Sequence, residues 1–205
     1  MKVGKKSYFL FVFLLHLACF QVALAQSHHE WSKSLVMYEV NVRQYSESGT
    51  FAAVEADLDR LEDLGVGILW FMPIHPIGEV NRLGSLGSYY SVKDYMAVNP
   101  AFGTKADFKS LVDAVHQRGM YVLMDWVPNH TSWDNVLTET NPEWYVQENG
   151  SFTSPPGTNW TDVIQLDHSQ AGLRDYMVDA MRYWVDSLGV DGFRFDAASF
   201  VPADY

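Results

Sequence analysis

The sequence predicts an α/β fold with parallel strands, because β-rich runs alternate along the chain with amphipathic helical patterns. A weak internal repeat supports this prediction: Leu-Gly-Val-Gly at 64–67 is echoed by Leu-Gly-Val-Asp at 188–191, each at a helix-to-strand junction. Reuse of one strand–helix unit produces such an echo. Periodicity alone leaves two arrangements open, a doubly wound sheet and about half of a (β/α)8 barrel.

The first part of the chain predicts two strands that flank a helix. A β-rich run predicts a strand over about 35–44. Four apolar side chains at helical spacing then predict a helix over 51–64. The apolar run 66–72 is the second expected strand, which gives one complete strand–helix–strand unit.

Two further units follow. Apolar residues at helical spacing predict a helix over 105–118, which Gly119 ends, and the chain returns as a third strand over 120–125. A long helix over 170–188 then leads to a fourth strand over 190–196. The expected architecture therefore has about four strand–helix units.

A segment without periodicity interrupts this alternation at 131–169. It is rich in Asn, Thr, Ser, Pro, Gly and Trp, and it is long enough to be a small inserted domain rather than an ordinary loop. Trp126, Trp133, Trp144 and Trp160 lie in or beside it. Flat indole rings suit the apolar faces of sugars, but the same rings can form the core of the insertion, and the sequence leaves both interpretations open.

Composition excludes several classes of protein. The chain of 205 residues is 48% hydrophobic and 19% charged, which predicts a globular fold rather than disorder. Its formal net charge is −11, so nucleic acid is an improbable partner and a neutral substrate suits the surface better. The one cysteine, Cys19, lies in the leader described next, which excludes cysteine chemistry in the rest of the chain.

Residues 1–25 have the layout of a secretory signal peptide. Three lysines precede an apolar run at 9–18, and the small-x-small triplet Ala23-Leu24-Ala25 follows. We expect cleavage after Ala25, a mature chain of 26–205, and secretion to an extracellular or periplasmic destination. A retained membrane anchor and a lipoprotein at Cys19 are weaker alternatives. No later segment has the roughly 20 apolar residues that span a bilayer, so no membrane association is expected after cleavage.

Polar residues end the third and fourth expected strands, where parallel α/β folds gather their active groups. Asp125 ends the third strand, while Arg194 and Asp196 end the fourth. Side chains two apart on a strand point the same way, and a guanidinium beside a carboxylate favours its ionised form. Asp196 could therefore be a positioned nucleophile, although a purely structural ion pair would have the same pattern.

Four segments resemble one known family in the right order. DWVPNH at 125–130 and GFRFDAASF at 192–200 look like the first two signature regions of the α-amylase family of glycoside hydrolases. The segments 88–104 and 163–167 resemble the family's sequence after its second strand and near the end of its B domain. The resemblance implies the N-terminal half of a (β/α)8 TIM barrel, about four βα units, with a short B-domain insertion at 131–169 after strand 3.

The same resemblance implies a set of site residues. Asp196 would be the catalytic nucleophile of a retaining mechanism, forming a covalent glycosyl ester. Arg194 would orient it, and Asp125 would support that arginine. His130 would hydrogen-bond a hydroxyl of the sugar being cleaved, and Tyr90 would stack beneath its ring.

The family also binds a structural calcium, for which Asn129 and Asp167 would be the matching ligands here. Three departures bear on this expectation. Ser199 and Phe200 replace a lysine and a histidine that many α-amylases carry after the nucleophile, and Gln165 replaces a common acidic residue.

The resemblance implies α-linked glucans, such as starch and maltooligosaccharides, as substrates. The sequence stops nine residues after Asp196, before the strand on which the family carries its acid/base glutamate. We therefore expect a truncated catalytic barrel over 26–205 that is inactive alone. Two alternatives stay open: a non-catalytic carbohydrate-binding protein, and a transglycosylase or isomerase of the same family.

Overall fold

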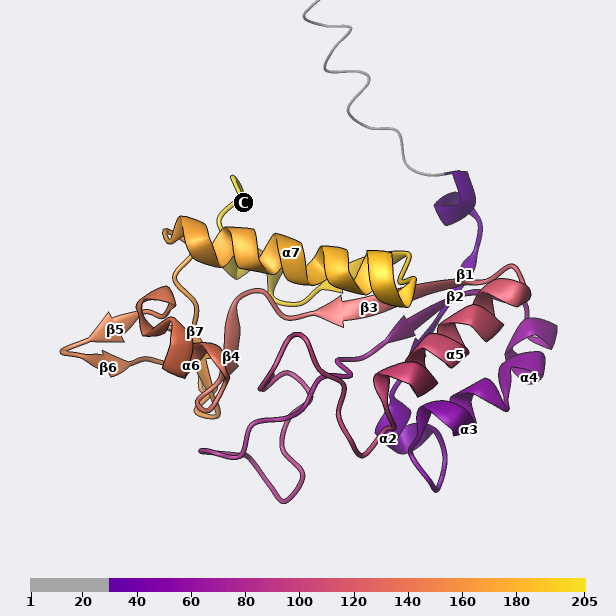
Figure 1. The fold of residues 1–205 in the computed structure, drawn as a ribbon, viewed down its shortest axis with the longest axis horizontal. Helices are drawn as coiled ribbons and strands as arrows, with labels where there is room; N and C mark the ends of the chain where they lie inside the picture. The colour runs from indigo at the N-terminus through magenta and orange to yellow at the C-terminus, as the bar shows by residue number, and fades with distance from the viewer. Residues whose placement is uncertain (1–29) are drawn as a thin grey trace, which may run out of the picture. The chain divides into compact units, whose positions relative to one another are not determined.

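The computed structural model describes residues 30–205 (Figure 1). The chain divides into two compact units, Met1–Leu35 and Val36–Tyr205. The described part of the first unit contains one short 3-10 helix, η2 (Glu30–Lys33). The expected signal peptide at 1–25 lies outside the described residues, so it stays a prediction. Within 30–205, no helix combines the length and the apolar character needed to cross a membrane.

The second unit is built on a four-stranded parallel sheet. Its strands are β1 (Val36–Val40), β2 (Val66–Phe71), β3 (Tyr121–Trp126) and β8 (Gly192–Phe195), and they lie side by side in that order. A doubly wound sheet reverses its strand order at a switch point, whereas a barrel adds each new strand on the same side. The observed order, which never reverses, confirms a partial α/β barrel.

Helices pack against this sheet (Figure 1). The helix α5 (Lys105–Gln117) contacts α3 (Phe51–Glu55) on one side and α7 (Ala171–Leu188) on the other. A capping box between Thr104 and Asp107 begins α5, and Gly189, at a φ of 81°, ends α7 in the left-handed conformation that favours glycine. The core between helices and sheet includes Leu69, Phe71, Phe108, Val112 and Trp184, all fully buried.

Two expected elements differ from the structure at their bounds. The strand expected at 35–44 ends at Val40, and the chain then forms the short helix α2 (Val42–Tyr45) after Asn41. The helix expected at 51–64 is broken into α3 and α4 (Leu58–Asp63). The break falls at Asp57, whose carboxylate accepts hydrogen bonds from Tyr45 and Arg60, so a local side-chain contact overrides the apolar periodicity.

The insertion after β3 forms a small antiparallel unit. Its first strand, β4 (His130–Ser132), pairs with its last, β7 (Val163–Gln165). Between them lie α6 (Leu137–Thr140), η3 (Pro142–Trp144), β5 (Gln147–Glu148) and β6 (Ser151–Phe152). A further short 3-10 helix, η4 (Ala198–Phe200), follows β8. The strand β4 begins shortly after β3 ends at Trp126, which places the start of the insertion at the carboxyl end of the sheet.

Candidate active site

Strand register places the predicted polar residues together at the carboxyl end of the sheet. In the β3–β8 pair, Asp125 lies opposite Arg194 and Trp126 lies opposite Phe195. The backbone N–H of Asp196 donates to the carbonyl of Trp126 at 2.8 Å, which extends the pairing by one residue. Residues 69 positions apart in the sequence therefore face one another across two adjacent strands.

One arginine nitrogen bridges two carboxylates. Nη1 of Arg194 donates to Oδ1 of Asp125 at 3.0 Å and to Oδ1 of Asp196 at 2.9 Å. The guanidinium carbon also lies 5.1 Å from the centre of the Trp70 ring. Arg194 thus contacts two carboxylates and one aromatic ring. This arrangement orients Asp196 through Oδ1, while no donor among the described residues bonds to Oδ2, so that this oxygen can act as a nucleophile.

Asp125 is the buried member of this group, with no exposed surface. Burial raises the pKa of its carboxyl to about 6, although the hydrogen bond and positive charge of Arg194 act in the opposite direction. A carboxylate can stay ionised in such a position only with a cation beside it. Asp125 and Arg194 therefore stabilise each other's ionised forms.

Tyr90 lies against the same carboxylate. Its hydroxyl donates to Oδ2 of Asp125 at 3.3 Å, and burial raises the pKa of this phenol. The ring comes from the long connection between β2 and α5. Tyr90 also lines the cavity that contains Asp196, so it can contact a ligand there.

His130 occupies the first position of β4 and is 3% exposed. Burial lowers the pKa of its imidazole to about 4, so the ring is neutral at neutral pH. The side-chain amide of Asn129 lies 3.2 Å from Nδ1 of His130. Because an amide nitrogen donates, Nδ1 accepts and Nε2 carries the proton. His130 can therefore donate to a hydroxyl group in the cavity.

Tyr90, His130 and Asp196 line one cavity of about 310 Å³. The lining residues come from the β2–α5 connection, the insertion and the end of β8: Leu83, Ser88, Tyr90, His130, Trp160, Asp162, Val163 and Asp196. Asp125 and Arg194 lie behind Asp196 and are absent from this lining. The structure thus separates groups that can touch a ligand from groups that position Asp196.

Asp162 is a site residue that the sequence analysis missed. It is 5% exposed, and no described side chain or backbone group bonds to its carboxylate. Its backbone is fixed instead, because its carbonyl accepts from Oγ of Ser91 at 3.0 Å. A buried carboxylate without a protein partner that opens on a cavity is suited to accept hydrogen bonds from a ligand. The one sequence signal that could have identified Asp162 was its position just before the segment 163–167, which resembles the α-amylase family.

Replacing Asp162 by asparagine should separate binding from stability. We expect Asp162→Asn to weaken maltotriose binding about tenfold, since a hydrogen bond to a charged acceptor contributes about 1.5 kcal/mol. The unfolding temperature should change little, because no described protein group loses a partner. Calorimetric titration and thermal unfolding of the variant measure the two effects. Unchanged affinity would show that the carboxylate does not contact the sugar.

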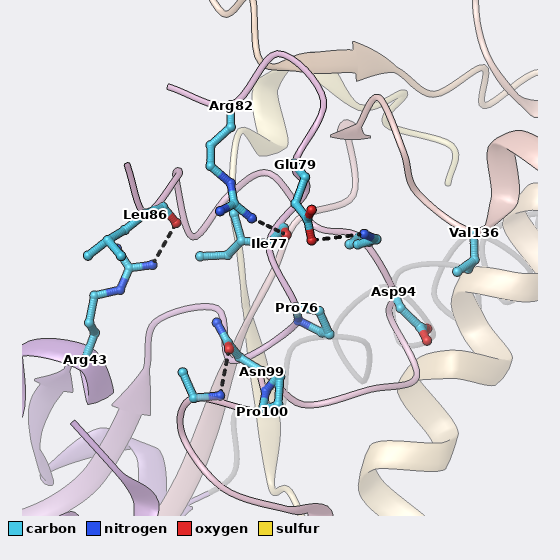
Figure 2. Close-up of a pocket in the computed structure, with 12 residues that line it drawn as sticks. Arg43, Pro76, Ile77, Glu79, Arg82, Leu86, Asp94, Asn99, Pro100 and Val136 are labelled. Carbon is cyan, nitrogen blue, oxygen red and sulfur yellow. Dashed lines mark hydrogen bonds and ion pairs between the residues drawn. The ribbon is translucent and has the colours of Figure 1, made fainter. Parts of the chain in front are cut away.

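A second and larger cavity, of about 550 Å³, lies between α2, the β2–α5 connection and the start of α6 (Figure 2). Its charged groups are already bonded within the protein. Arg43 donates to the carbonyls of Leu86 and Gly87, and Arg82 donates to those of Ile77 and Gly78. These bonds fix the β2–α5 connection, which carries Tyr90. We therefore place the candidate active site at the smaller cavity, which contains Asp196.

An ion pair ties the same connection to the insertion. Nζ of Lys93 lies 3.1 Å from Oδ2 of Asp134 and 3.6 Å from Oε1 of Glu79. The hydrogen bond from Lys93 to Asp134 raises the pKa of the lysine. Burial opposes ionisation of Asp134, but bonds from the Glu79 backbone and from Lys93 still lower its pKa. The β2–α5 connection, which carries Tyr90, is therefore fixed against the insertion, which carries Trp160.

The sequence of residues 40–166, more than half of the chain, matches the family model described as Alpha amylase, catalytic domain. This chain belongs to the α-amylase family. Alpha-amylase 3 from Dictyoglomus thermophilum is 27% identical over 94% of the chain and 42% of that relative. A trehalose synthase/amylase from Mycolicibacterium smegmatis is 31% identical over 83% of the chain and 34% of the relative.

Solved α-amylase structures agree with this membership. The enzyme from Lactobacillus plantarum is 50% identical, with a TM-score of 0.80 over 83% of this chain and 40% of that one. A maltogenic α-amylase from Thermotoga neapolitana is 44% identical, with a TM-score of 0.78 over the same shares. The chain spans about two-fifths or less of these relatives. The α-amylase-type barrel fold is thereby confirmed for the part of the family represented here.

The calcium ligands implied by the α-amylase family fit poorly. Oδ1 of Asn129 is buried and has no partner, as a metal ligand could be. The carboxylate of Asp167, however, accepts from the Ser169 backbone and from Gln170 at 3.0 Å each, at the start of α7. Calcium takes six to eight oxygens, and the described residues include no group of three acidic, histidine or cysteine side chains with the geometry to hold a metal ion. Calcium binding stays a prediction, and no step below depends on it.

The four tryptophans have different environments. Trp126 is fully buried in the core. Trp144 packs on Tyr176 of α7, at a ring distance of 5.7 Å, and Trp133 donates to the carbonyl of Thr161. Of the four, Trp160 alone lines the cavity that contains Asp196. Contacts within the protein therefore explain the positions of three of these rings, and Trp160 is the ring that can contact a ligand.

Proposed function

We propose that these residues form the nucleophile-bearing part of a retaining glycoside hydrolase that acts on α-linked glucans. One observation carries the proposal: Arg194 bridges Asp125 and Asp196 while Asp196 lines a cavity with Tyr90 and His130. Support comes from membership in the α-amylase family and from the relatives named above. The substrate class follows from that membership, since starch and maltooligosaccharides are the α-glucans that amylases cleave.

In the proposed reaction, the free oxygen of Asp196 attacks the anomeric carbon of the bound sugar. A bond forms between that carbon and the carboxylate as the glycosidic carbon–oxygen bond breaks. The departing oxygen takes a proton from an acid, and water later displaces Asp196 so that configuration is retained. Arg194 orients Asp196 through a hydrogen bond, His130 donates to a hydroxyl of the sugar, and Tyr90 lies against the sugar ring.

The proton donor is the group that the described residues do not supply. The carboxyl groups that line the cavity within residues 30–205 are those of Asp162 and Asp196, with no glutamate among them. We therefore propose that residues 30–205 bind and orient glucan but need a further carboxylic acid for turnover. We propose secretion as well, on the basis of the leader pattern at 1–25.

A chimera provides the test. Residues 36–205 would be joined to the C-terminal part of the Lactobacillus plantarum α-amylase, which is 50% identical over the shared part. The chimera is treated with a fluorinated glucosyl fluoride, in which fluoride departs without protonation and the ring fluorine slows hydrolysis of the ester. We expect one added fluoroglucosyl group on the peptide that contains Asp196, measured by mass spectrometry.

The result can also contradict the proposal. Turnover of maltooligosaccharides with no label at Asp196 would exclude the covalent mechanism. Binding of maltooligosaccharides without label or turnover would favour the alternative of a non-catalytic carbohydrate-binding protein. A chimera that forms mainly transfer products would place the chain among the transglycosylases of the family.

A further inference from the structure

Both outer strands of the parallel sheet have an open edge within residues 30–205. Strand β1 pairs with β2 alone, and β8 pairs with β3 alone. Apolar side chains are exposed at both edges: Val36 and Met37 of β1 are 59% and 48% exposed, and Phe195 of β8 is 45% exposed. Such edges are templates for pairing with a further strand.

A second copy of this chain fits these edges in number and in direction. A (β/α)8 barrel has eight parallel strands, and two copies supply four each. A two-fold axis along the barrel sets β8 of each copy beside β1 of the other, so that every strand stays parallel and the order stays unreversed. This arrangement pairs all the open edges at once, which a single added strand cannot do.

Strand register determines which residues meet at the new edge. One ladder of paired residues crosses the sheet: Glu39, Trp70, Leu123 and Gly192. A barrel with a shear of about eight residues displaces such a ladder by about one residue per strand, hence by about four across one copy. The strand ends show the direction, because Phe71 ends β2 and pairs with Met124, yet β3 continues beyond this level to Trp126. The displacement on β8 is therefore toward its carboxyl end.

Glu39 lies on the inner face of the sheet. Side chains alternate along a strand, and the neighbouring Val40 is fully buried in the same core as Val54 of α3. Glu39 therefore points to the opposite face, together with its ladder partner Trp70, whose ring centre lies 5.1 Å from the guanidinium carbon of Arg194. The side chain of Glu39 is exposed in one copy, so its carboxyl is accessible to an added strand.

We propose that two copies of this chain close one barrel, in which Glu39 of each copy is the acid/base partner of Asp196 in the other. Asp196 lies four residues beyond Gly192, so the displaced ladder sets it opposite Glu39 of the second copy. Paired strands lie about 4.8 Å apart, close to the roughly 5–5.5 Å between the two carboxyl groups of retaining glycosidases. The same register sets the exposed Phe195 opposite Tyr38. The inference rests on the proposed function and adds the source of its proton donor.

These two groups balance the reaction. Glu39 of one copy gives a proton to the glycosidic oxygen, which keeps the electron pair of the broken bond while Asp196 of the other copy bonds to the anomeric carbon. Water then bonds to that carbon and returns a proton to Glu39, and Asp196 leaves with the electron pair of the ester bond. One barrel contains two such sites.

Mixing two inactive variants of the 205-residue chain tests the exchange of residues between copies. Glu39→Gln and Asp196→Asn should each lower maltotriose turnover by at least about 10²-fold. A mixed dimer of the two keeps one site with both carboxyl groups. Half of the dimers in an equimolar mixture are mixed, so about a quarter of the turnover of the unchanged chain should return. Glu148→Gln, at an exposed glutamate of β5, is the matched control and should keep full turnover.

The mass in solution is the second measurement. Sedimentation equilibrium of the unchanged chain should give twice the mass of one copy. Val36→Lys should give the mass of one copy and lose turnover, while its circular dichroism stays unchanged because Val36 is exposed in a single copy. Val80→Lys is the control, since Val80 is 50% exposed but lies away from both edges, in the β2–α5 connection.

A chain that stays monomeric, or a mixture of variants without recovered turnover, would overturn the shared barrel. A monomer that binds the separately produced C-terminal part of the Lactobacillus plantarum enzyme would also overturn it, by assigning the edges to that part. A dimer whose turnover survives Glu39→Gln would exclude this glutamate as the acid. None of these results decides the proposed function, which is tested by labelling of Asp196 in the chimera.

Discussion

Replacing Asp196 by asparagine in the chimera should lower kcat on maltooligosaccharides by about 10⁴-fold or more, the scale on which loss of a nucleophile acts in covalent catalysis. Asparagine keeps the size of the side chain and can still face Nη1 of Arg194, which lies 2.9 Å from Asp196 in this structure. It offers no anionic oxygen to the anomeric carbon. Steady-state kinetics of the variant measure the loss, and a fall of less than tenfold would contradict the assigned role.

A chemical rescue distinguishes a nucleophile from a structural carboxylate. In Asp196→Gly, the space of the side chain is open, and added azide can attack the anomeric carbon directly. We expect azide to restore reaction with a glucosyl fluoride and to give a glucosyl azide of inverted configuration. Asp204→Asn is the matched control, because Asp204 is an exposed carboxylate, 3.0 Å from Arg174, outside the cavity. Its kcat should stay within twofold of the unchanged chimera.

Replacing Arg194 by methionine should destabilise the protein strongly and in a pH-dependent way. The change leaves the fully buried carboxylate of Asp125 without its cation. Loss of one partner of a buried pair costs about 3–5 kcal/mol, and the 39% exposure of the Arg194 side chain reduces this to about 2–3 kcal/mol at pH 8. Urea unfolding of the 205-residue chain measures the difference in free energy of unfolding.

The sign of the pH dependence follows from the raised pKa of Asp125. A carboxyl whose folded pKa is about 6, against an ordinary value of 3.8, favours the folded state most below about pH 4. That contribution is lost as the pH rises through 6. Without Arg194 the folded pKa rises further, so the penalty should be small near pH 4 and largest at neutral pH and above.

Two further variants sharpen this result. Asp125→Asn combined with Arg194→Met should recover part of the stability at pH 8, because the buried charge is removed together with its partner. Arg182→Met is the surface control, since the exposed side chain of Arg182 lies 3.7 Å from that of Asp179 on α7. This change should cost no more than about 0.5 kcal/mol. An equal penalty at pH 4 and pH 8 would show that the ionisation of Asp125 is not its cause.

The fold was largely predictable because its signals are local. The apolar run of β2, the helical spacing of α5 with its glycine stop, and the length of α7 are all properties of short segments. One error, the unbroken helix expected over 51–64, arose where a side-chain contact competes with the spacing of apolar residues. Asp57 bonds to Tyr45 and breaks an otherwise regular helix, which the spacing of apolar residues could not show.

The residues of the candidate site could be predicted where they lie at the ends of strands, but not where they lie in irregular segments. Asp125, Arg194 and Asp196 were found because each ends a strand, and parallel strands present their carboxyl ends at one edge. Asp162 and Leu83 were missed because they belong to irregular segments, which reach the cavity only through contacts such as Ser91 to Asp162. No periodicity marks such residues in a sequence.

The sequence by itself determined the parallel α/β class, the strand-end carboxylates and the family, since all of these reside in consecutive residues. The tertiary structure decided the unreversed strand order, the sharing of one arginine nitrogen by Asp125 and Asp196, and the contact between the rings of His130 and Trp160. These features join residues tens of positions apart. Their geometry depends on strand register and on the packing of the insertion against the β2–α5 connection, which only the folded chain defines.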